Sequence, residues 1–303
     1  MAGDEGIVEG LYESLITREL ARRIAATPGL HFGEGAIADA DEPEIFSRHL
    51  RDAVRRALVA ERQPARRLEL LNQLLSALGD DRSGVVKASQ LLSAASPPTP
   101  GRAAYDLRRP ATPLSDAALL TNAHGEPGIG AEVRAEMPSA DHVDAIIAFV
   151  KWYGLRVIEP ELAVIHRRGV PLRVITTTYM GATERQALDR LVRDFGAQVK
   201  IQYDSQRTRL HAKAWLFRRN TGFDTAYVGS SNLSRAALLD GVEWNVRLSS
   251  VATPAILQKF RATFDSYWAD PTFESYDPDR DADRLDDALA EASGRTTHDR
   301  VTL

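Results

Sequence analysis

A histidine and a lysine separated by one residue carry the clearest chemical signal in this chain. The tripeptide His211-Ala212-Lys213 lies in an apolar run, residues 210–217, whose alternation predicts a strand. On a strand, His211 and Lys213 project from the same face, so that an imidazole and an ammonium can address one phosphate group. The tripeptide is uninformative by itself, and its weight depends on the residues further along the chain.

Two more polar groups stand at the ends of predicted strands. The apolar run at residues 226–228 leads into Gly229-Ser230-Ser231-Asn232. A tight turn at this place can offer backbone N–H groups, a hydroxyl and a side-chain amide to an anion. A third run, residues 243–248, begins with Glu243. The alternative interpretation is an ordinary turn followed by a solvated glutamate at the start of a strand.

The three features, in this order, resemble the phospholipase D superfamily and most of all its nuclease branch. That family usually has an aspartate a few residues after the lysine, whereas residues 214–217 here lead to Arg218. The nuclease branch instead places an acidic residue downstream of its G-S-x-N turn, where Glu243 stands. Longer segments also resemble the N-terminal region of bacterial superfamily 2 helicases that carry a phospholipase-D-like module ahead of the motor: residues 10–23, 176–184 and 209–219.

The resemblance implies a mechanism and an oligomeric state. His211 would attack phosphorus and form a phosphohistidine, while Lys213 and Asn232 would stabilise the charge of the pentavalent transition state. Glu243 would accept a hydrogen bond from the other ring nitrogen of His211 and hold its tautomer. Family members use two H-x-K motifs and this chain has one. A homodimer with one His211 from each subunit is therefore implied.

Several residues near the predicted strand ends are candidates for substrate binding. In open α/β sheets, ligands gather at the carboxyl ends of parallel strands. Lys151 comes after one predicted strand, Thr177 and Tyr179 end another, and Arg209 precedes the motif strand. We expect Lys151, Thr177, Arg209 and the turn residue Ser230 to contact substrate. Each also has an ordinary interpretation as a surface or turn residue.

Composition limits the classes of function. The chain is 44% hydrophobic and 26% charged, with no membrane-span-sized apolar stretch and no signal-peptide pattern, which favours a cytoplasmic protein. The absence of cysteine excludes disulfides, thiolate nucleophiles and cysteine-based zinc sites. The histidine spacing does not predict a metal centre, and no G-x4-G-K-[ST] motif is present. We therefore expect no cofactor, and any helicase motor would lie outside this chain.

The chain has a net charge of −4, but its charged residues are distributed unevenly along the sequence. Residues 141–260, which contain the motifs, have more Lys and Arg than Asp and Glu, whereas residues 261–303 have the opposite excess. A basic motif region is compatible with a face that binds the phosphates of DNA. Ordinary variation in surface charge is the alternative explanation.

Four parts are predicted along the chain. Residues 1–95 show apolar positions at helical spacing and predict a small helical module. A proline-rich linker is predicted at residues 96–113. Residues 114–269 alternate between strand and helix patterns, which predicts an α/β fold with a mixed β-sheet flanked by helices. Residues 270–303 are rich in aspartate and are interpreted as an acidic tail or linker, as in a fragment of a longer chain.

Three functions stay open from the sequence. The leading hypothesis is a metal-independent phosphodiesterase, an endonuclease acting on DNA in a helicase-linked or defence setting. The second is a non-catalytic nucleic-acid-binding and dimerisation module, which the missing aspartate favours. The third is phospholipid hydrolysis, disfavoured because no amphipathic membrane-binding helix is evident. The sequence does not choose between DNA and RNA, or between single and double strands.

Overall fold

The chain divides into two units, Met1–Leu92 and Ser93–Leu303. A computed structural model describes residues 7–94, 108–123, 125–203 and 209–294. Most of the predicted linker at residues 96–113 lies outside the described residues.

The first unit is helical. It contains α1 (Arg18–Ala25), α2 (Glu42–Ala60) and α3 (Pro64–Ala77). The side chain of Thr17 accepts a hydrogen bond from the N–H of Leu20 and so caps α1. Both α2 and α3 carry a proline in the first turn, where a missing N–H breaks no helical bond. None of the described residues of this unit is fully buried, so the main core lies in the second unit.

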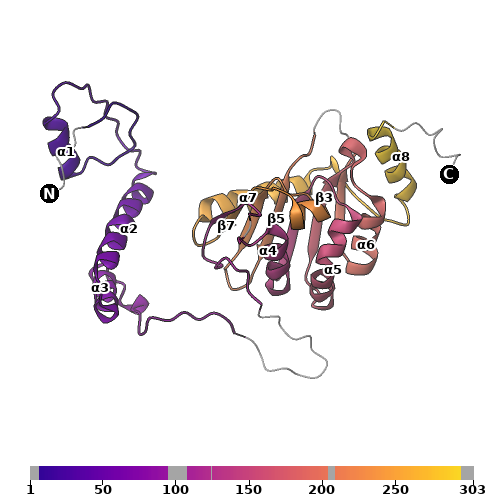
Figure 1. The fold of residues 1–303 in the computed structure, drawn as a ribbon, viewed down its shortest axis with the longest axis horizontal. Coiled ribbons are helices and arrows are strands. Elements are labelled where there is room, and N and C mark those ends of the chain that lie inside the picture. The colour runs from indigo at the N-terminus through magenta and orange to yellow at the C-terminus, as the bar shows by residue number, and fades with distance from the viewer. Residues whose placement is uncertain (1–6, 95–107, 124, 204–208, 295–303) are drawn as a thin grey trace. The chain divides into compact units, whose positions relative to one another are not determined.

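One eight-stranded mixed sheet forms the centre of the second unit (Figure 1). Its strands, in chain order, are β1 (Ala118–Leu120), β2 (His142–Ile147), β3 (Leu172–Thr177), β4 (Gln198–Gln202), β5 (Lys213–Arg218), β6 (Thr225–Gly229), β7 (Asn245–Ser249) and β8 (Phe273–Ser275). The order across the sheet is β1-β7-β6-β5-β2-β3-β4-β8. β2, β3 and β4 are parallel to one another, and every other pairing is antiparallel. The predicted α/β fold with a mixed sheet is confirmed.

Helices cover both faces of this sheet (Figure 1). α4 (Ile129–Glu136), α5 (Trp152–Arg167) and α6 (Arg185–Phe195) pack on one face, and α7 (Pro254–Ala269) packs on the other. Because strand side chains alternate, β5 contributes Trp215 and Phe217 to the larger core and Leu216 to the core under α7. The central strands β2, β3 and β5 are therefore buried on both sides and can hold the residues at their ends rigidly.

The prediction for residues 270–303 is wrong over its described part. β8 pairs with β4 and extends the sheet, and α8 (Ala282–Ala292) packs against the turn after β3. Phe273, Tyr276 and Leu285 are all buried. Phe273 and Tyr276 stand singly among polar residues, and the helical spacing of Leu285 and Leu289 is set among so many aspartates that the segment resembles a solvated tail. Residues 295–303 lie outside the described residues.

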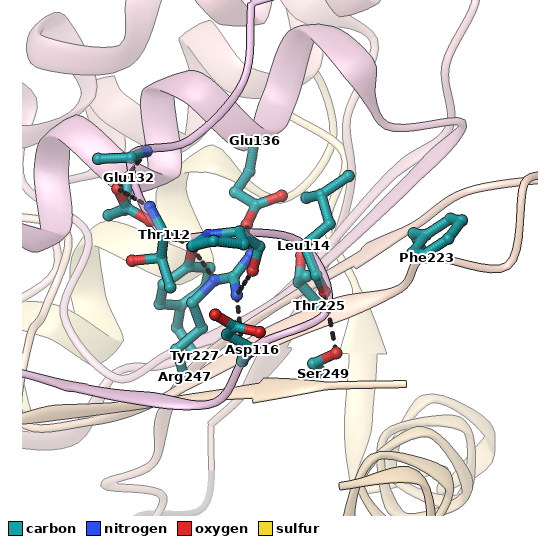
Figure 2. Close-up of polar contacts among 12 residues, drawn as sticks. Thr112, Leu114, Asp116, Glu132, Glu136, Phe223, Thr225, Tyr227, Arg247 and Ser249 are labelled. Carbon is teal, nitrogen blue, oxygen red and sulfur yellow. Dashed lines mark hydrogen bonds and ion pairs between the residues drawn. The ribbon is translucent and has the colours of Figure 1, made fainter. Parts of the chain in front are cut away.

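A buried network of charged side chains lies beneath β6 and β7, toward the end of β5 that is remote from Lys213 (Figure 2). Glu136 of α4 accepts hydrogen bonds from Arg219, from Arg247 at 3.0 Å and from the Tyr227 hydroxyl at 2.8 Å. Burial by itself raises the pKa of Glu136, but the two arginines outweigh it and hold that pKa below its usual value. Every strong charge in this network therefore has a partner.

Candidate active site

Strand register brings the motif residues to one end of the sheet. Lys213, the first residue of β5, pairs with Ile147 at the end of β2. Gly229 at the end of β6 pairs with Asn245 at the start of β7. β3 runs parallel to β2 and ends at Thr177 on the same side. The H-x-K motif, the G-S-S-N turn and the carboxyl ends of β2 and β3 therefore meet at one place.

His211 and Lys213 contact each other directly. The Lys213 Nζ lies 2.9 Å from Nδ1 and 3.1 Å from Nε2 of His211, and it donates a hydrogen bond to the His211 carbonyl oxygen at 2.7 Å. His211 is exposed and precedes β5 rather than lying within it, so the strand begins later than the sequence pattern predicts. The side chain of Lys213 is buried, and the residue is only 6% exposed.

Two opposing effects act on the pKa of Lys213, and the one that lowers it is the larger. Burial lowers the pKa of its ammonium group, and the negative charge of Glu243 opposes that shift. The Lys213 ammonium therefore places a positive charge directly against the ring of His211.

The start of the G-S-S-N turn is shaped by a close approach of β7. A Cβ at Gly229 would lie 2.2 Å from the carbonyl oxygen of Trp244, which only glycine avoids. The backbone N–H of Ser230 donates to the same carbonyl at 3.0 Å. This amide, one of those that a tight turn could offer to an anion, is thus engaged by the sheet.

Asn232 lies across the turn from the end of β2. Its side-chain oxygen accepts a hydrogen bond from the backbone N–H of Phe149 at 3.1 Å. That bond fixes which end of the amide is the acceptor, and it leaves the NH₂ group as the donor for an anion. The predicted role of Asn232 in binding phosphate is compatible with this arrangement.

Glu243 does not make the contact expected of it. Its carboxylate accepts a hydrogen bond from the Ser230 hydroxyl, and no hydrogen bond to His211 is found among the described residues. The two residues come from the turn after β6 and the segment before β7, where the Ser230 backbone also bonds to the carbonyl oxygen of Trp244. In this structure Glu243 acts on Lys213 through its charge rather than on the histidine tautomer.

Two predicted substrate contacts are already engaged within the protein. The Thr177 hydroxyl is buried, donates to the carbonyl of Gln202 at 3.2 Å and accepts from the N–H of Tyr179 at 3.1 Å. The Lys151 Nζ lies 3.6 Å from Oε1 of Glu184. Thr177 therefore shapes the turn after β3, and the charge of Lys151 is partly neutralised.

Two aromatic residues, Phe149 and Tyr179, lie beside the motif. Phe149, which comes just after β2, has its ring centroid 5.7 Å from that of His211 in an edge-on arrangement. Tyr179, just after β3, lies 6.5 Å from Phe149, and the guanidinium of Arg209 lies 5.7 Å from the Tyr179 ring. The apolar pattern places Phe149 in a buried strand, yet its position at the end of a parallel strand marks a place where ligands collect.

Neither a metal centre nor a membrane span is found in the parts that the structure describes. No group of three or more His, Cys, Asp or Glu side chains there is arranged to hold a metal ion. None of the helices there is both long and apolar enough to cross a bilayer.

Residues 141–268 match the family model described as "Cardiolipin synthase, PLD-like domain". The matched segment contains the H-x-K motif, the G-S-S-N turn and Glu243. The match covers less than half of the chain, and it supports the resemblance of this segment to the phospholipase D superfamily. The resemblance to a helicase N-terminal region stays a prediction. No curated protein gives a significant match to the sequence.

Three solved structures resemble part of this chain at low sequence identity. Nuc from Salmonella typhimurium, described as a phospholipase D family member, is 17% identical over 53% of this chain and 97% of that chain, with a TM-score of 0.41. NucT from Helicobacter pylori is 12% identical over 53% and 99%, with a TM-score of 0.41. The phosphatidylserine synthase of Haemophilus influenzae Rd KW20 is 10% identical over 58% and 44%, with a TM-score of 0.42.

Proposed function

We propose that the PLD-like domain is a metal-independent phosphodiesterase that cleaves DNA. The observation that carries the proposal is the direct contact between the Lys213 ammonium and the His211 ring at a sheet end that also holds Asn232. An unprotonated imidazole, a nearby cation and an amide donor are the groups that phosphoryl transfer requires when lysine supplies the positive charge.

The proposed reaction has two displacements. A ring nitrogen of His211 attacks phosphorus, the bond to the leaving oxygen breaks, and a phosphohistidine forms. A second histidine protonates the leaving oxygen and then removes a proton from the water that hydrolyses the intermediate. Lys213 and the NH₂ group of Asn232 stabilise the added negative charge in both transition states.

The second histidine is proposed to come from a second copy of this chain. Leu119, Val228 and Val246 stand in register on three neighbouring strands and are 50%, 40% and 46% exposed. We call these three residues the apolar strip. Val228 precedes Gly229 directly, so the strip lies at the same end of the sheet as the motif. A two-fold axis beside the strip would bury it and bring a second His211 to the site.

A nuclease assay in excess EDTA tests the catalytic proposal. The purified chain is offered single-stranded DNA, double-stranded DNA and RNA, next to the variant His211→Ala. We expect cleavage by the unaltered chain and none by the variant, with binding retained. Binding without cleavage by either protein would establish the non-catalytic module instead. Strict dependence on Mg²⁺ or Mn²⁺ would point to a different site.

Sedimentation equilibrium tests the shared site. Val246→Lys places a charge in the apolar strip and should convert dimers to monomers with loss of activity. Val251→Lys is the matched control, because Val251 is similarly exposed at 54% but lies past the other end of β7. A monomer with full activity would refute the shared-site arrangement. Attachment to a helicase motor and a cytoplasmic location remain predictions from the sequence.

A further inference from the structure

Two aromatic rings beside the motif take no part in the proposed reaction. The rings of Phe149 and Tyr179 are stacked, with centroids 6.5 Å apart and an interplanar angle of 27°. Both residues are only partly buried, although each comes after a strand whose other residues are mostly buried. Phe149 also contacts His211 edge-on. A partly exposed ring pair, one ring of which contacts the proposed nucleophile, is placed to contact whatever lies next to the reacting phosphate.

Backbone contacts hold both rings in place. The N–H of Phe149 donates to Asn232, and the N–H of Tyr179 donates to the buried hydroxyl of Thr177. The turn continues through Met180, whose φ of 61° is unusual for a residue other than glycine. The turn is thus fixed before any substrate arrives, and binding to it loses little conformational entropy.

The last helix of the second unit supports the same turn. A Cβ at Gly181 would lie 2.4 Å from the carbonyl oxygen of Leu289 in α8. Gly181 also has a φ of 59°, a conformation that favours glycine. The backbone of the turn therefore packs directly on α8 and cannot relax without moving that helix.

Positive charges lie beside both rings. The guanidinium of Arg209 is 5.7 Å from the centroid of Tyr179, and the Nζ of Lys213 is 5.9 Å from the centroid of Phe149. Rings interleaved with cations are the combination that binds unpaired nucleotides, because bases stack on the rings and phosphates pair with the charges. Bases within a duplex are stacked on one another, and most contacts to duplex DNA are to its backbone.

We propose that Phe149, Tyr179 and Arg209 form a stacking shelf for the nucleobase next to the scissile phosphate, so that the site takes single-stranded nucleic acid. This inference rests on the proposed function, since the phosphate at His211 and Lys213 sets which base reaches the shelf. A diester without a base, such as a phospholipid, has no aromatic group to stack there.

Oligonucleotide binding tests the shelf. Fluorescence anisotropy is measured with a phosphorothioate DNA 12-mer, which resists cleavage, with its duplex, and with a 12-mer that carries tetrahydrofuran abasic sites throughout. Tyr179→Leu should weaken binding of the single strand on the order of 10-fold, the usual effect of losing one stacking ring. Tyr179→Phe keeps the ring and should bind like the unaltered chain. Tyr153→Leu is the matched control, because Tyr153 is 70% exposed on α5 and belongs to no proposed site.

The abasic strand separates the shelf from the rest of the site. The unaltered chain should bind the abasic strand about as weakly as Tyr179→Leu binds the intact strand. Tyr179→Leu should not weaken binding of the abasic strand any further. Equal losses for the intact and abasic strands, or a duplex bound as tightly as the single strand, would overturn the shelf.

Cleavage of strands with ordinary phosphodiester linkages then distinguishes the stacking shelf from the phosphodiesterase proposal. If the unaltered chain cleaves the intact and abasic strands but Tyr179→Leu affects both equally, the shelf fails and the phosphodiesterase stands. If the chain cleaves neither strand yet prefers the intact one in binding by way of Tyr179, the phosphodiesterase fails. The shelf then remains as a binding site for unpaired bases, without a scissile phosphate beside it.

Discussion

β5 carries a lysine at its start and an arginine just past its end, and the two cations have opposite surroundings. Arg219 is buried against Glu136, a carboxylate that also pairs with Arg247. Lys213 is buried too, but its hydrogen-bond partners are the carbonyl oxygen and ring of an exposed histidine, and Glu243 acts on it only through its charge. The buried network is electrostatically complete, whereas the motif end has room for one more negative charge.

This difference separates stability from chemistry within one strand. A completed buried ion network contributes little when intact, but the loss of one partner leaves an uncompensated charge in a dry environment. An incompletely paired cation keeps part of its binding energy for a ligand and, above all, for the charge that develops during reaction. Changes at the two ends of β5 should therefore affect different measurements.

Glu136→Gln should have the largest effect on folding. Two buried arginines would lose their shared carboxylate, and we expect a loss of about 3–5 kcal/mol in the free energy of unfolding. Urea titration followed by circular dichroism measures it. Glu243→Gln is the matched control and should cost under about 1 kcal/mol, since Glu243 is partly exposed. Similar losses for both variants would erase the contrast between the two ends.

Among the changes that compare the two ends of β5, Lys213→Met should have the largest effect on catalysis. The methionine keeps most of the side chain's volume and removes its charge, and we expect kcat to fall on the order of 10²-fold or more. Unfolding measured in urea should show no loss of stability, because a buried charge is removed. Lys259→Met, an exposed position on α7, should change neither quantity. If Lys213→Met unfolds readily but cleaves DNA normally when folded, then Lys213 contributes to stability and not to catalysis.

Glu243→Gln should move the alkaline limb of the rate profile. Burial lowers the pKa of Lys213 and Glu243 raises it, so removing the carboxylate lets the pKa fall further. The ammonium form is the active one, and activity should therefore decline at a lower pH than in the unaltered chain. A pH profile of kcat/KM measures the shift. Ser230→Ala keeps the carboxylate but removes its hydrogen-bond donor, and the limb should then stay near its original position.

Lys151→Met should have the smallest effect. Its charge already lies 3.6 Å from Glu184, so little of its attraction for phosphate is available. We expect KM for DNA to rise by no more than about 2–3-fold at moderate salt, because screened surface charges contribute weakly to binding. Arg209→Met, by comparison, should raise KM more. A larger effect at Lys151 would mean that substrate displaces Glu184.

The local pattern of the sequence predicts the central elements well. The helix and strand patterns place every strand from β1 to β7 and the helices α4 to α7, because apolar alternation and helical spacing are strong in buried elements. The pattern misses Phe273 and Tyr276 as core residues, because each is an isolated apolar residue whose burial depends on the rest of the fold. Leu285 and Leu289 do stand at helical spacing, but the aspartates around them favour a solvated segment.

The types of the site residues are easier to predict than their partners. His211 and Lys213 meet as expected, because a separation of one residue fixes their relation on an extended chain. Glu243 contacts the Ser230 hydroxyl, and its predicted contact with His211 is not found among the described residues. Which side chain a carboxylate reaches depends on side-chain conformations and on the backbone around it, and neither can be read from residue spacing.

β8 also has a practical consequence for preparing the domain. A fragment cut at the end of the family match, residue 268, would leave β4 without its outer neighbour. The carbonyl oxygen of Val199, which accepts from the N–H of Tyr276 at 2.9 Å, would be unpaired along with the rest of that edge. Bare edges of this kind add strands from other molecules. Such a fragment should precipitate on expression, whereas one that extends through residue 294 should remain in solution.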